Sequence, residues 1–317
     1  MPLPQHPARS AQDLTNDLTA LLDGTEAQFC VGQIAPAMAR LCESLLAHRL
    51  ATSEPVWRET VSRVCLPHPL RTWLHQDPYT RRAFDKPRGY AGDAVMLDFV
   101  YRGTPPPETS ATGAAVFRAT TRLPNGLSVV ERRARLAWML DDLAERGEHP
   151  RVLSVACGHL REGHQISALP AGRFGEFIAL DQDRESLAVV AQEQGRFVTA
   201  REASVRDLLR RRVTFHDMDF VYAAGLFDYL SDSVATRLLA MLFQMLAPGG
   251  RVLIANFKPA SHGRGYMEAF MDWYLLYRDE RGLEKLTAEI PDNAIADRQT
   301  YSDSYGNVAY LELTRGR

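Results

Sequence analysis

The stretch "PRVLSVACGHLREG" (150–163) indicates how the chain folds. Its apolar run begins at Val152 and stops at Cys157 and Gly158, where small residues replace the branched ones. A short apolar run that ends in a glycine turn predicts a buried strand of a parallel sheet. Glycine at such a turn lets the backbone bend and lets a ligand approach it closely, which a larger side chain would prevent.

The chain after residue 163 alternates between short apolar runs and helical patterns. This alternation predicts a parallel sheet covered by helices on both faces. Further strands are expected at 176–183, 197–204, 218–225 and 251–257, with a helix at 233–246. The segments "IADRQTYSD" (295–303) and "VAYLELTRG" (308–316) leave no room for a helix between them, so they predict an antiparallel hairpin at the sheet edge.

The first part of the chain has a different character. Residues 1–75 place apolar residues at helical spacing, and no strand alternation intervenes. A helix is expected over 128–150, with Ser128 and Glu131 as a capping box. We therefore expect a helical cap over residues 1–127, and an α/β domain over 128–317 with a helical insertion around 262–285.

Composition limits the classes of protein that fit. The 317 residues carry a net charge of −2 and are 45% hydrophobic, which favours a globular protein without a basic surface for nucleic acid. The basic segment 206–212 is interpreted as a solvated helix end. The four cysteines show no disulfide or zinc spacing, and no signal or membrane-spanning pattern is present. These features predict a cytoplasmic protein that does not insert into membranes.

Two residues point to a nucleotide ligand. Asp181 ends the second expected strand and lies 23 residues after Gly158. In doubly wound sheets, an acidic group at that place accepts hydrogen bonds from ribose hydroxyls. The alternative is that Gly158 makes only a tight turn and that Asp181 caps a helix. The three-glycine dinucleotide fingerprint is absent, which counts against a nicotinamide oxidoreductase.

The pattern resembles the class I methyltransferases, which use S-adenosylmethionine. The resemblance rests on "VACG", "ALD", "DFVYAAGLFDYL" and "MLAPGGRVLIANF", together with the expected C-terminal hairpin, and covers residues 128–317. It implies a Rossmann-like seven-stranded methyltransferase sheet and S-adenosylmethionine as the cofactor. Cys157 stands where that family has an acidic or small residue, and only one early glycine is present.

A narrower resemblance covers residues 70–317. The stretches "FDKPRGYAGDAVMLDFVY" (84–101), "AAGLFDYLSD" (223–232) and "NFKPASHGRGYMEAFMDWYLLYR" (256–278) are similar to bacterial methyltransferases identified with synthesis of the 3-hydroxypalmitic acid methyl ester signal. The last stretch is expected to contain a helix over 263–278. The resemblance implies a small-molecule substrate, with the carboxylate of a fatty or hydroxy acid as first choice.

Candidate site residues follow from these patterns and resemblances. The residues expected to bind the cofactor are Arg88, Tyr90, Cys157, Gly158, Asp181, Gln182, Ser204, Val205 and Ala223, with adenine near Ser204 and Val205. The residues expected to act in catalysis are Tyr90, Asp228 and Tyr229. The residues expected to bind substrate are Asp93, Arg264, Tyr266, Tyr277 and Arg278. Simpler structural roles compete with several of these, since Asp93 also suits a helix cap and Tyr266 and Tyr277 also suit a core.

Other functions remain open at this point. His159, Glu162 and His164 lack the spacing of a zinc site, so no metal is expected. N-methylation of an amino acid or small amine is the alternative reaction, and it usually needs a base that an ionised carboxylate does not need. A non-catalytic module that binds S-adenosylmethionine is the alternative of another class. The sequence leaves open whether the chain forms a homodimer.

Overall fold

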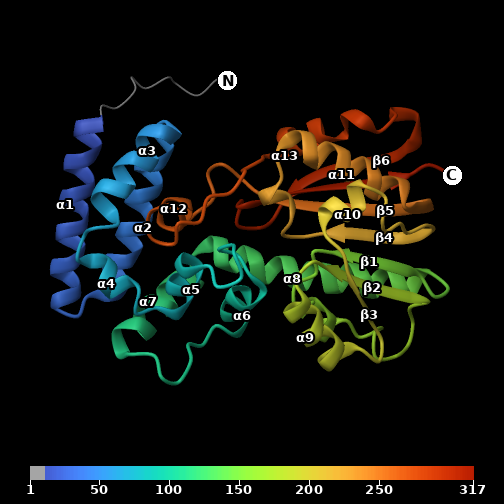
Figure 1. The fold of residues 1–317 in the computed structure, drawn as a ribbon, viewed down its shortest axis with the longest axis horizontal. Helices are drawn as coiled ribbons and strands as arrows, with labels where there is room; N and C mark the ends of the chain where they lie inside the picture. Colours follow the sequence, from blue (N-terminus) through green and yellow to red (C-terminus); the bar gives the residue numbers. More distant parts are fainter. Residues whose placement is uncertain (1–10) are drawn as a thin grey trace. The chain divides into compact units, whose positions relative to one another are not determined.

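The computed structural model describes residues 11–317, which divide into two compact units (Figure 1). The first unit comprises the chain up to Leu127 together with Ala260–Tyr274. The second comprises Ser128–Pro259 and Leu275–Arg317. Part of the segment expected as an insertion in the second domain therefore groups with the first unit.

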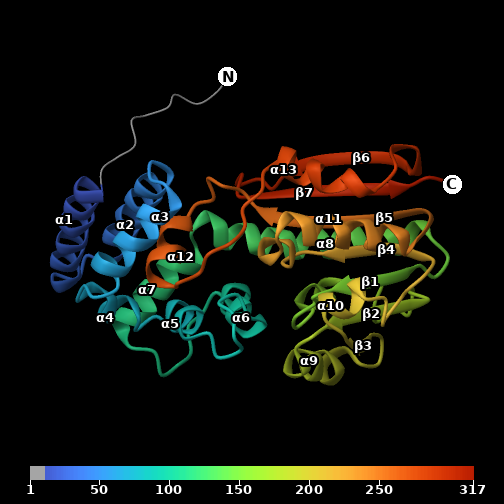
Figure 2. The ribbon, with the colours of Figure 1, turned by 45° about the horizontal axis from the view of Figure 1, so that its top comes forward.

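The first unit is helical. Its helices are α1 (Ala11–Cys30), α2 (Ile34–Leu50), α3 (Glu54–Thr60), a π turn (Val61–Cys65), α4 (Leu70–Leu74), α5 (Pro78–Asp85), α6 (Ala94–Arg102), α7 (Ala111–Thr121) and α12 (Arg264–Phe270). Figures 1 and 2 both show α12 beside α2, far from it in the sequence. A Cβ added at Gly265 would lie 2.4 Å from the carbonyl carbon of Leu45, so only glycine permits this close packing.

The helix expected over 263–278 is shorter than predicted. α12 ends at Phe270, and Asp272 adopts a left-handed conformation with φ of 46°. The backbone N–H of Trp273 then donates to the carbonyl of Met267 at 3.0 Å. The chain runs on without regular structure to α13 (Glu280–Lys285). The aromatic residues in this stretch therefore do not share one helical face.

The second unit contains a seven-stranded sheet in the order β3-β2-β1-β4-β5-β7-β6. The strands are β1 (Arg151–Val155), β2 (Glu176–Asp181), β3 (Thr199–Glu202), β4 (Met218–Ala223), β5 (Leu246–Phe257), β6 (Ile295–Ser302) and β7 (Val308–Arg315). The first five are parallel, and β7 pairs antiparallel with both β5 and β6. The predicted α/β sheet and its edge hairpin are confirmed, and this order is that of the Rossmann-like methyltransferase fold.

β5 begins earlier than expected. It starts at Leu246 and runs through the glycine pair, with a register shift against β4 between Met218 and Phe220. A Cβ at Gly250 would lie 2.5 Å from the carbonyl oxygen of Met218, so the strands approach closely where Gly250 has no side chain. The "APGG" segment thus lies inside the strand.

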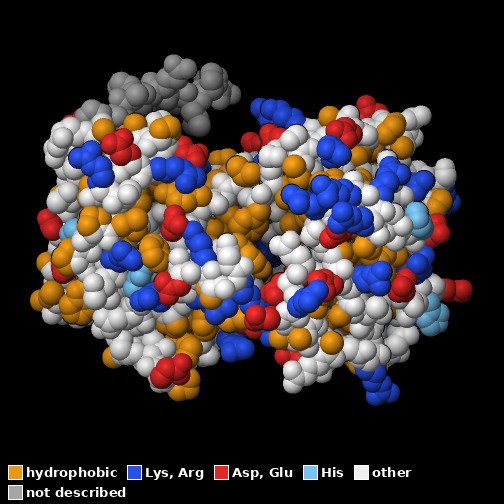
Figure 3. Space-filling view, in the orientation of Figure 1, with side chains coloured by type: hydrophobic (Ala, Val, Ile, Leu, Met, Phe, Trp, Pro, Cys, Tyr) orange, Lys and Arg blue, Asp and Glu red, His pale blue; other side chains and the backbone are white. Residues whose placement is uncertain are grey.

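Helices and short turns complete the second unit. They are α8 (Pro124–Arg146), α9 (Arg184–Gln194), α10 (Val205–Leu209), α11 (Asp232–Gln244), α13, and 3₁₀ turns at Arg161–Gln165, Phe227–Tyr229, Leu286–Glu289 and Asp292–Ala294. The first residues of α8, up to Leu127, group with the first unit. Lys and Arg side chains gather over α10 in Figure 3, where Arg212 pairs with Asp207 at 3.1 Å.

The predicted capping box of α8 is wrong. The helix begins at Pro124, whose fixed φ suits a first turn, so Ser128 lies inside it. The Ser128 hydroxyl instead accepts a hydrogen bond from Asn307 at 3.0 Å, and the Glu131 carboxylate accepts from the backbone N–H of Ser304. Both residues therefore hold α8 against the hairpin turn.

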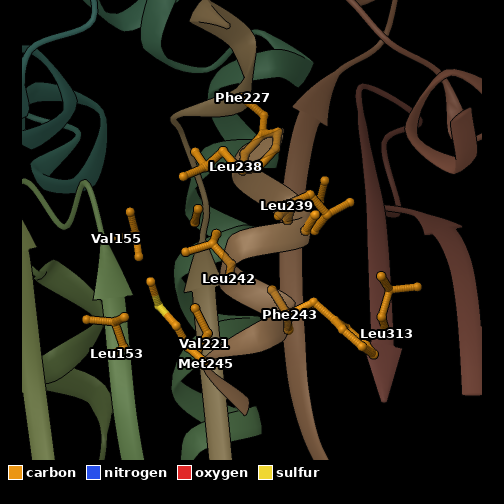
Figure 4. Packing of buried hydrophobic residues seen from close by; sticks show 14 of the residues in the cluster. Leu153, Val155, Val221, Phe227, Leu238, Leu239, Leu242, Phe243, Met245 and Leu313 are labelled. Carbon is orange, nitrogen blue, oxygen red and sulfur yellow. The ribbon is translucent and has the colours of Figure 1, made fainter. Parts of the chain in front are cut away.

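The main core of the second unit lies between α11 and the sheet. Leu238, Leu239, Leu242 and Phe243 of α11 point at strand residues such as Val221 (Figure 4). Alternate strand residues face the opposite side, where Arg135 of α8 lies over the ring of Tyr310. Two covered faces explain why Val152, Leu153 and Val155 of β1 are all apolar, although neighbouring strand residues point to opposite faces.

Within residues 11–317, no helix combines the length and the apolar character that crossing a membrane would require.

Candidate functional site

The turn after β1 is built from left-handed backbone. Ala156, Gly158 and Leu160 have φ values of 54°, 55° and 48°. Two of these are residues with side chains, which adopt this region at some cost in free energy. The backbone N–H of Gly158 donates to the Asp181 carboxylate at 2.8 Å, so the end of β2 holds the turn in place.

Asp181 is nearly buried and accepts from two backbone groups. Besides Gly158, the N–H of Asp183 donates to it at 2.9 Å. Burial raises the pKa of Asp181, while these backbone hydrogen bonds oppose the shift. A carboxylate has about four accepting positions, so Asp181 can also accept from ligand hydroxyls. Gln182, the next residue, is exposed.

Three further residues expected to bind the cofactor lie at the same edge of the sheet. Ser204 follows β3 and caps α10 through a reciprocal pair of bonds with Asp207, with Val205 as the first helical residue. Ala223 is the last residue of β4. The carboxyl ends of β1 to β4 thus bring these positions together. β1 lies between β2 and β4, so the strand order reverses there, which is where doubly wound sheets bind ligands.

Cys157 does not have the character of a nucleophile. Burial and then the negative charge of Asp181 raise the pKa of its thiol well above the ordinary value. The thiol is therefore neutral at physiological pH, and the thiolate is the reactive form. Cys157 lies in the turn after β1, and its expected contact with the cofactor stays a prediction.

Asp228 is buried in the 3₁₀ turn after β4. Its Oδ1 accepts from the backbone N–H of Phe257 at 2.7 Å and from Nδ2 of Asn256 at 2.9 Å. Its backbone carbonyl accepts from the N–H of Leu276 at 2.8 Å. Burial raises the pKa of Asp228 to about 6, although the positive charges of Arg132 and Arg278 oppose this. Asp228 joins the ends of β4 and β5, and its expected role in catalysis stays a prediction.

Arg278 was expected to bind substrate, but its five N–H donors are all engaged within the second unit. Nε and Nη2 donate to the Asp232 carboxylate at 3.0 and 2.6 Å, and Nη2 also donates to the Leu230 carbonyl. Nη1 donates to the Phe227 carbonyl and to Asn256 Oδ1. This network fixes the turn around Asp228, so the structure gives Arg278 a supporting role and not substrate contact.

Tyr229, Leu276 and Tyr277 lie around the same turn. Tyr229 is 38% exposed and Leu276 is 45% exposed, while Tyr277 is half-buried. Exposed large apolar side chains beside a buried polar network suit contact with an apolar ligand. Tyr229 stays a candidate for contact with the methyl acceptor.

The segment 86–93 forms a turn between α5 and α6 of the first unit. Gly89 has a φ of 87°, and Arg88 and Tyr90 on either side of it are half-buried. Asp93 caps α6 by accepting from the N–H of Met96 at 2.8 Å and pairs with Arg82 at 2.8 Å. Asp93 thus has the structural role that the sequence left open, and Arg88 and Tyr90 stay predictions.

Two further residues expected to bind substrate lie in α12. Arg264 donates to Glu268 at 2.8 Å, and Glu268 also pairs with Arg49. Tyr266 is 1% exposed, and its hydroxyl lies 2.9 Å from the Thr80 hydroxyl. Tyr266 is therefore a core residue of the first unit, because a side chain so enclosed does not line a binding surface.

His159, Glu162 and His164 do not converge. Glu162 is buried and accepts from the Tyr222 hydroxyl at 2.7 Å, while His164 is exposed and lies 2.8 Å from Glu193. Within residues 11–317, no group of three metal-ligating side chains gathers in a way that could hold a metal ion.

Sequence reasoning missed Arg132 of α8. Its side chain is 5% exposed, and Nη1 donates to the carbonyl of Ala224, just after β4, at 2.5 Å. The sequence does contain a sign of this burial. Arg132 lies four and eight residues before Leu136 and Leu140, so it falls on the apolar stripe of the helix. A charged residue on an apolar stripe marks a buried charge with a specific partner.

The chain is similar to several solved structures. A possible exported protein from Bordetella parapertussis is similar over 98% of both chains, with 17% identity and a TM-score of 0.54. Magnesium protoporphyrin IX methyltransferase (ChlM) from Synechocystis PCC 6803 with bound S-adenosylhomocysteine is 14% identical, over 71% of this chain and 95% of that chain, with a TM-score of 0.47. The N-methyltransferase NodS from Bradyrhizobium japonicum WM9 is 13% identical, over 59% and 97%, with a TM-score of 0.42.

At these identities the similarity concerns the fold alone. Neither a protein-family model nor a curated protein sequence matches the chain.

Proposed function

We propose that the protein is an enzyme that transfers a methyl group from S-adenosylmethionine to a small molecule. The observation that carries this proposal is the Gly158–Asp181 hydrogen bond at the switch point between β1 and β4. It joins a left-handed turn, which brings the backbone close to a ligand, to a carboxylate placed to accept from ribose hydroxyls. The resemblance of the sequence motifs to class I methyltransferases supports the same cofactor.

The residues present fit that cofactor. The half-buried Ser204 and Val205 follow β3, where the adenine is expected, and Ala223 and the turn around Asp228 follow β4. S-adenosylmethionine, when bound, supplies a methyl group on a positively charged sulfur. The chain's part is to hold the acceptor in line with that methyl group and to exclude water.

We propose the carboxylate of a fatty or hydroxy acid as the acceptor. In this reaction a bond forms between a carboxylate oxygen and the methyl carbon while the bond from that carbon to sulfur breaks, leaving a methyl ester. An ionised carboxylate needs no general base. The nearly complete burial of Asp228, with Oδ1 already accepting two hydrogen bonds, suits an acceptor of this kind. N-methylation of a small amine remains the alternative.

Calorimetric titration with S-adenosylhomocysteine tests the cofactor. Asp181→Asn should weaken binding by about 1.5–3 kcal/mol, because it removes a charged acceptor. Glu202→Gln is the matched control, since Glu202 ends the neighbouring strand β3 but is exposed and pairs with Arg184. Equal affinity of wild type and Asp181→Asn would refute the assignment of Asp181.

The acceptor class is tested with cofactor labelled on its methyl group. Incubation with fatty or hydroxy acids, followed by mild alkali, should release the label as methanol, because alkali hydrolyses methyl esters. Label that stays bound to an amine product under alkali would favour the alternative reaction.

A further inference from the structure

Three arginine side chains lie exposed on and directly after α10, the short helix that follows β3. Arg206 lies in the helix, Arg210 follows its last residue, and Arg211 comes next. The backbone N–H of Arg210 donates to the carbonyl of Arg206 at 3.0 Å, so these two lie one helical turn apart on the same side. Figure 3 shows Lys and Arg side chains gathered over α10. We call Arg206, Arg210 and Arg211 the arginine patch.

The acidic residues that neighbour the arginine patch in the sequence are paired with other arginines. Asp207 pairs with Arg212 at 3.1 Å, and Glu202 pairs with Arg184 at 2.8 Å. Within residues 11–317, no carboxylate forms an ion pair with an arginine of the patch. Three positive charges therefore stand together on this surface without neutralisation by the described part of the chain.

The core of the second unit fixes the backbone that carries the arginine patch. Leu208 is fully buried in this core, and Val205 and Leu209 pack against it half-buried. The reciprocal bonds between Ser204 and Asp207 begin the helix. The apolar side of α10 thus faces inward, and its arginines are presented to solvent.

The ligands already proposed do not account for the arginine patch. S-adenosylmethionine has a net positive charge at neutral pH, and the proposed acceptor has a single carboxylate. The whole chain has a net charge of −2, so it does not attract anions by its total charge. Attraction to the patch acts over about 8 Å at physiological salt. A fitting partner therefore brings several negative charges close to this one surface.

A layer of anionic lipid headgroups fits the arginine patch better than a nucleic acid does. Proteins that bind single strands add exposed aromatic side chains on which bases stack. Phe215, the first aromatic residue after the patch, is half-buried and packs against the core. Lipid phosphates need no such platform, since clustered arginines on an amphipathic helix bind them through charge and paired hydrogen bonds.

We propose that the arginine patch binds the headgroups of anionic phospholipids and docks the second unit on a membrane surface. The contact is electrostatic, because the apolar residues of α10 pack on the core and are not available for insertion. This proposal does not depend on the proposed methyl transfer.

Sedimentation of the full chain with lipid vesicles tests the proposal. Wild type should bind vesicles of phosphatidylcholine mixed with phosphatidylglycerol, should not bind vesicles of phosphatidylcholine alone, and should be released by added salt. The triple variant Arg206→Gln, Arg210→Gln, Arg211→Gln should bind the mixed vesicles about 100-fold more weakly, because each arginine near an anionic surface contributes about fivefold. Its melting temperature should match wild type, since all three side chains are exposed. The corresponding triple lysine variant keeps the charge and should keep most of the binding.

The matched control removes three exposed arginines of the first unit, as Arg40→Gln, Arg118→Gln, Arg122→Gln. It changes the net charge equally and should bind the mixed vesicles as wild type does. Equal weakening by both triple variants would show an effect of net charge alone and would overturn the proposal. Absence of wild-type binding to the mixed vesicles, or equal binding to both kinds of vesicle, would overturn it too. Wild type that binds an RNA oligonucleotide but not the mixed vesicles would assign the patch to nucleic acid instead.

Discussion

Each unit of the molecule contains one deeply buried aspartate whose pKa burial raises to about 6, and the two are held differently. Asp77 in the first unit accepts only from neutral donors: the N–H groups of Tyr79 and Thr80 and the hydroxyls of Thr80 and Thr120. Asp228 in the second unit accepts from the backbone N–H of Phe257, the last residue of β5, and from the side-chain amide of Asn256.

The difference lies in charge and in location. Asp77 caps α5 and ties it to α7, and no cation is among the main contributors to its pKa. Asp228 lies beyond β4, where Arg132 and Arg278 both lower its pKa. The same burial therefore serves helix packing in one unit and the arrangement of a candidate site in the other. Substitutions at the two aspartates should separate stability from activity.

The largest effect is expected for Asp77→Ala. The variant leaves buried hydrogen-bond donors without an acceptor, namely the first backbone N–H groups of α5 and the Thr120 hydroxyl. The free energy of unfolding should therefore fall by about 2–4 kcal/mol. Chemical denaturation with circular dichroism measures this. A loss below about 1 kcal/mol would mean that water replaces the carboxylate at low cost.

The second prediction concerns pH. The pKa of Asp77 is about 6 when folded and about 3.9 when unfolded. Its stabilising contribution is therefore complete below about pH 3.9 and is lost as the pH rises through about 6. Wild type should lose about 2 kcal/mol relative to Asp77→Asn between pH 4 and 7, measured by urea unfolding. Parallel pH profiles of the two proteins would contradict the raised pKa.

Asp228→Asn should affect turnover more than stability. The amide oxygen can still accept from Phe257 and Asn256, but the negative charge that faces two arginines is lost. Displacement of the turn after β4 should lower the methyl-transfer rate about tenfold or more, since small misplacements of reacting groups are costly. Melting temperature and rate are measured on the same sample. A large drop in melting temperature with a normal rate per folded molecule would make Asp228 purely structural.

Tyr90→Phe is expected to give the smallest change. Tyr90 lies in the turn between α5 and α6, and the variant removes only a hydroxyl. If that hydroxyl contacts cofactor or substrate, turnover should fall about 2- to 10-fold with an unchanged melting temperature. Steady-state rates together with thermal melting decide this. An unaltered rate would remove Tyr90 from the candidate site.

The sheet could be predicted because its signals are local. β1, β2 and β4 are short, mostly apolar runs. Asp181 ends β2, and Gly158 lies in the turn that follows β1. The start of α8 could not be predicted, because Ser128 and Glu131 match a capping box but bond to the hairpin turn through tertiary contacts.

The roles of Arg278 and Arg264 could not be predicted from the sequence either. Arg278 is buried because two carbonyls, an amide and a carboxylate from distant parts of the second unit surround it, and none of these is adjacent in sequence. Arg264 pairs with Glu268 one turn away, a spacing visible in the sequence, but the added contact of Glu268 with Arg49 is tertiary. Charge alone does not distinguish a supporting arginine from one that meets a ligand.

The two edges of the sheet affect how copies of the chain can meet. β3 has four residues, and β6 carries Asp297, Arg298 and Gln299 on its exposed stretch. Short strands and charged side chains at an edge hinder the addition of another strand. A homodimer, if one forms, should therefore not join its sheets edge to edge, and concentrated solutions should resist the aggregation that bare strand edges promote.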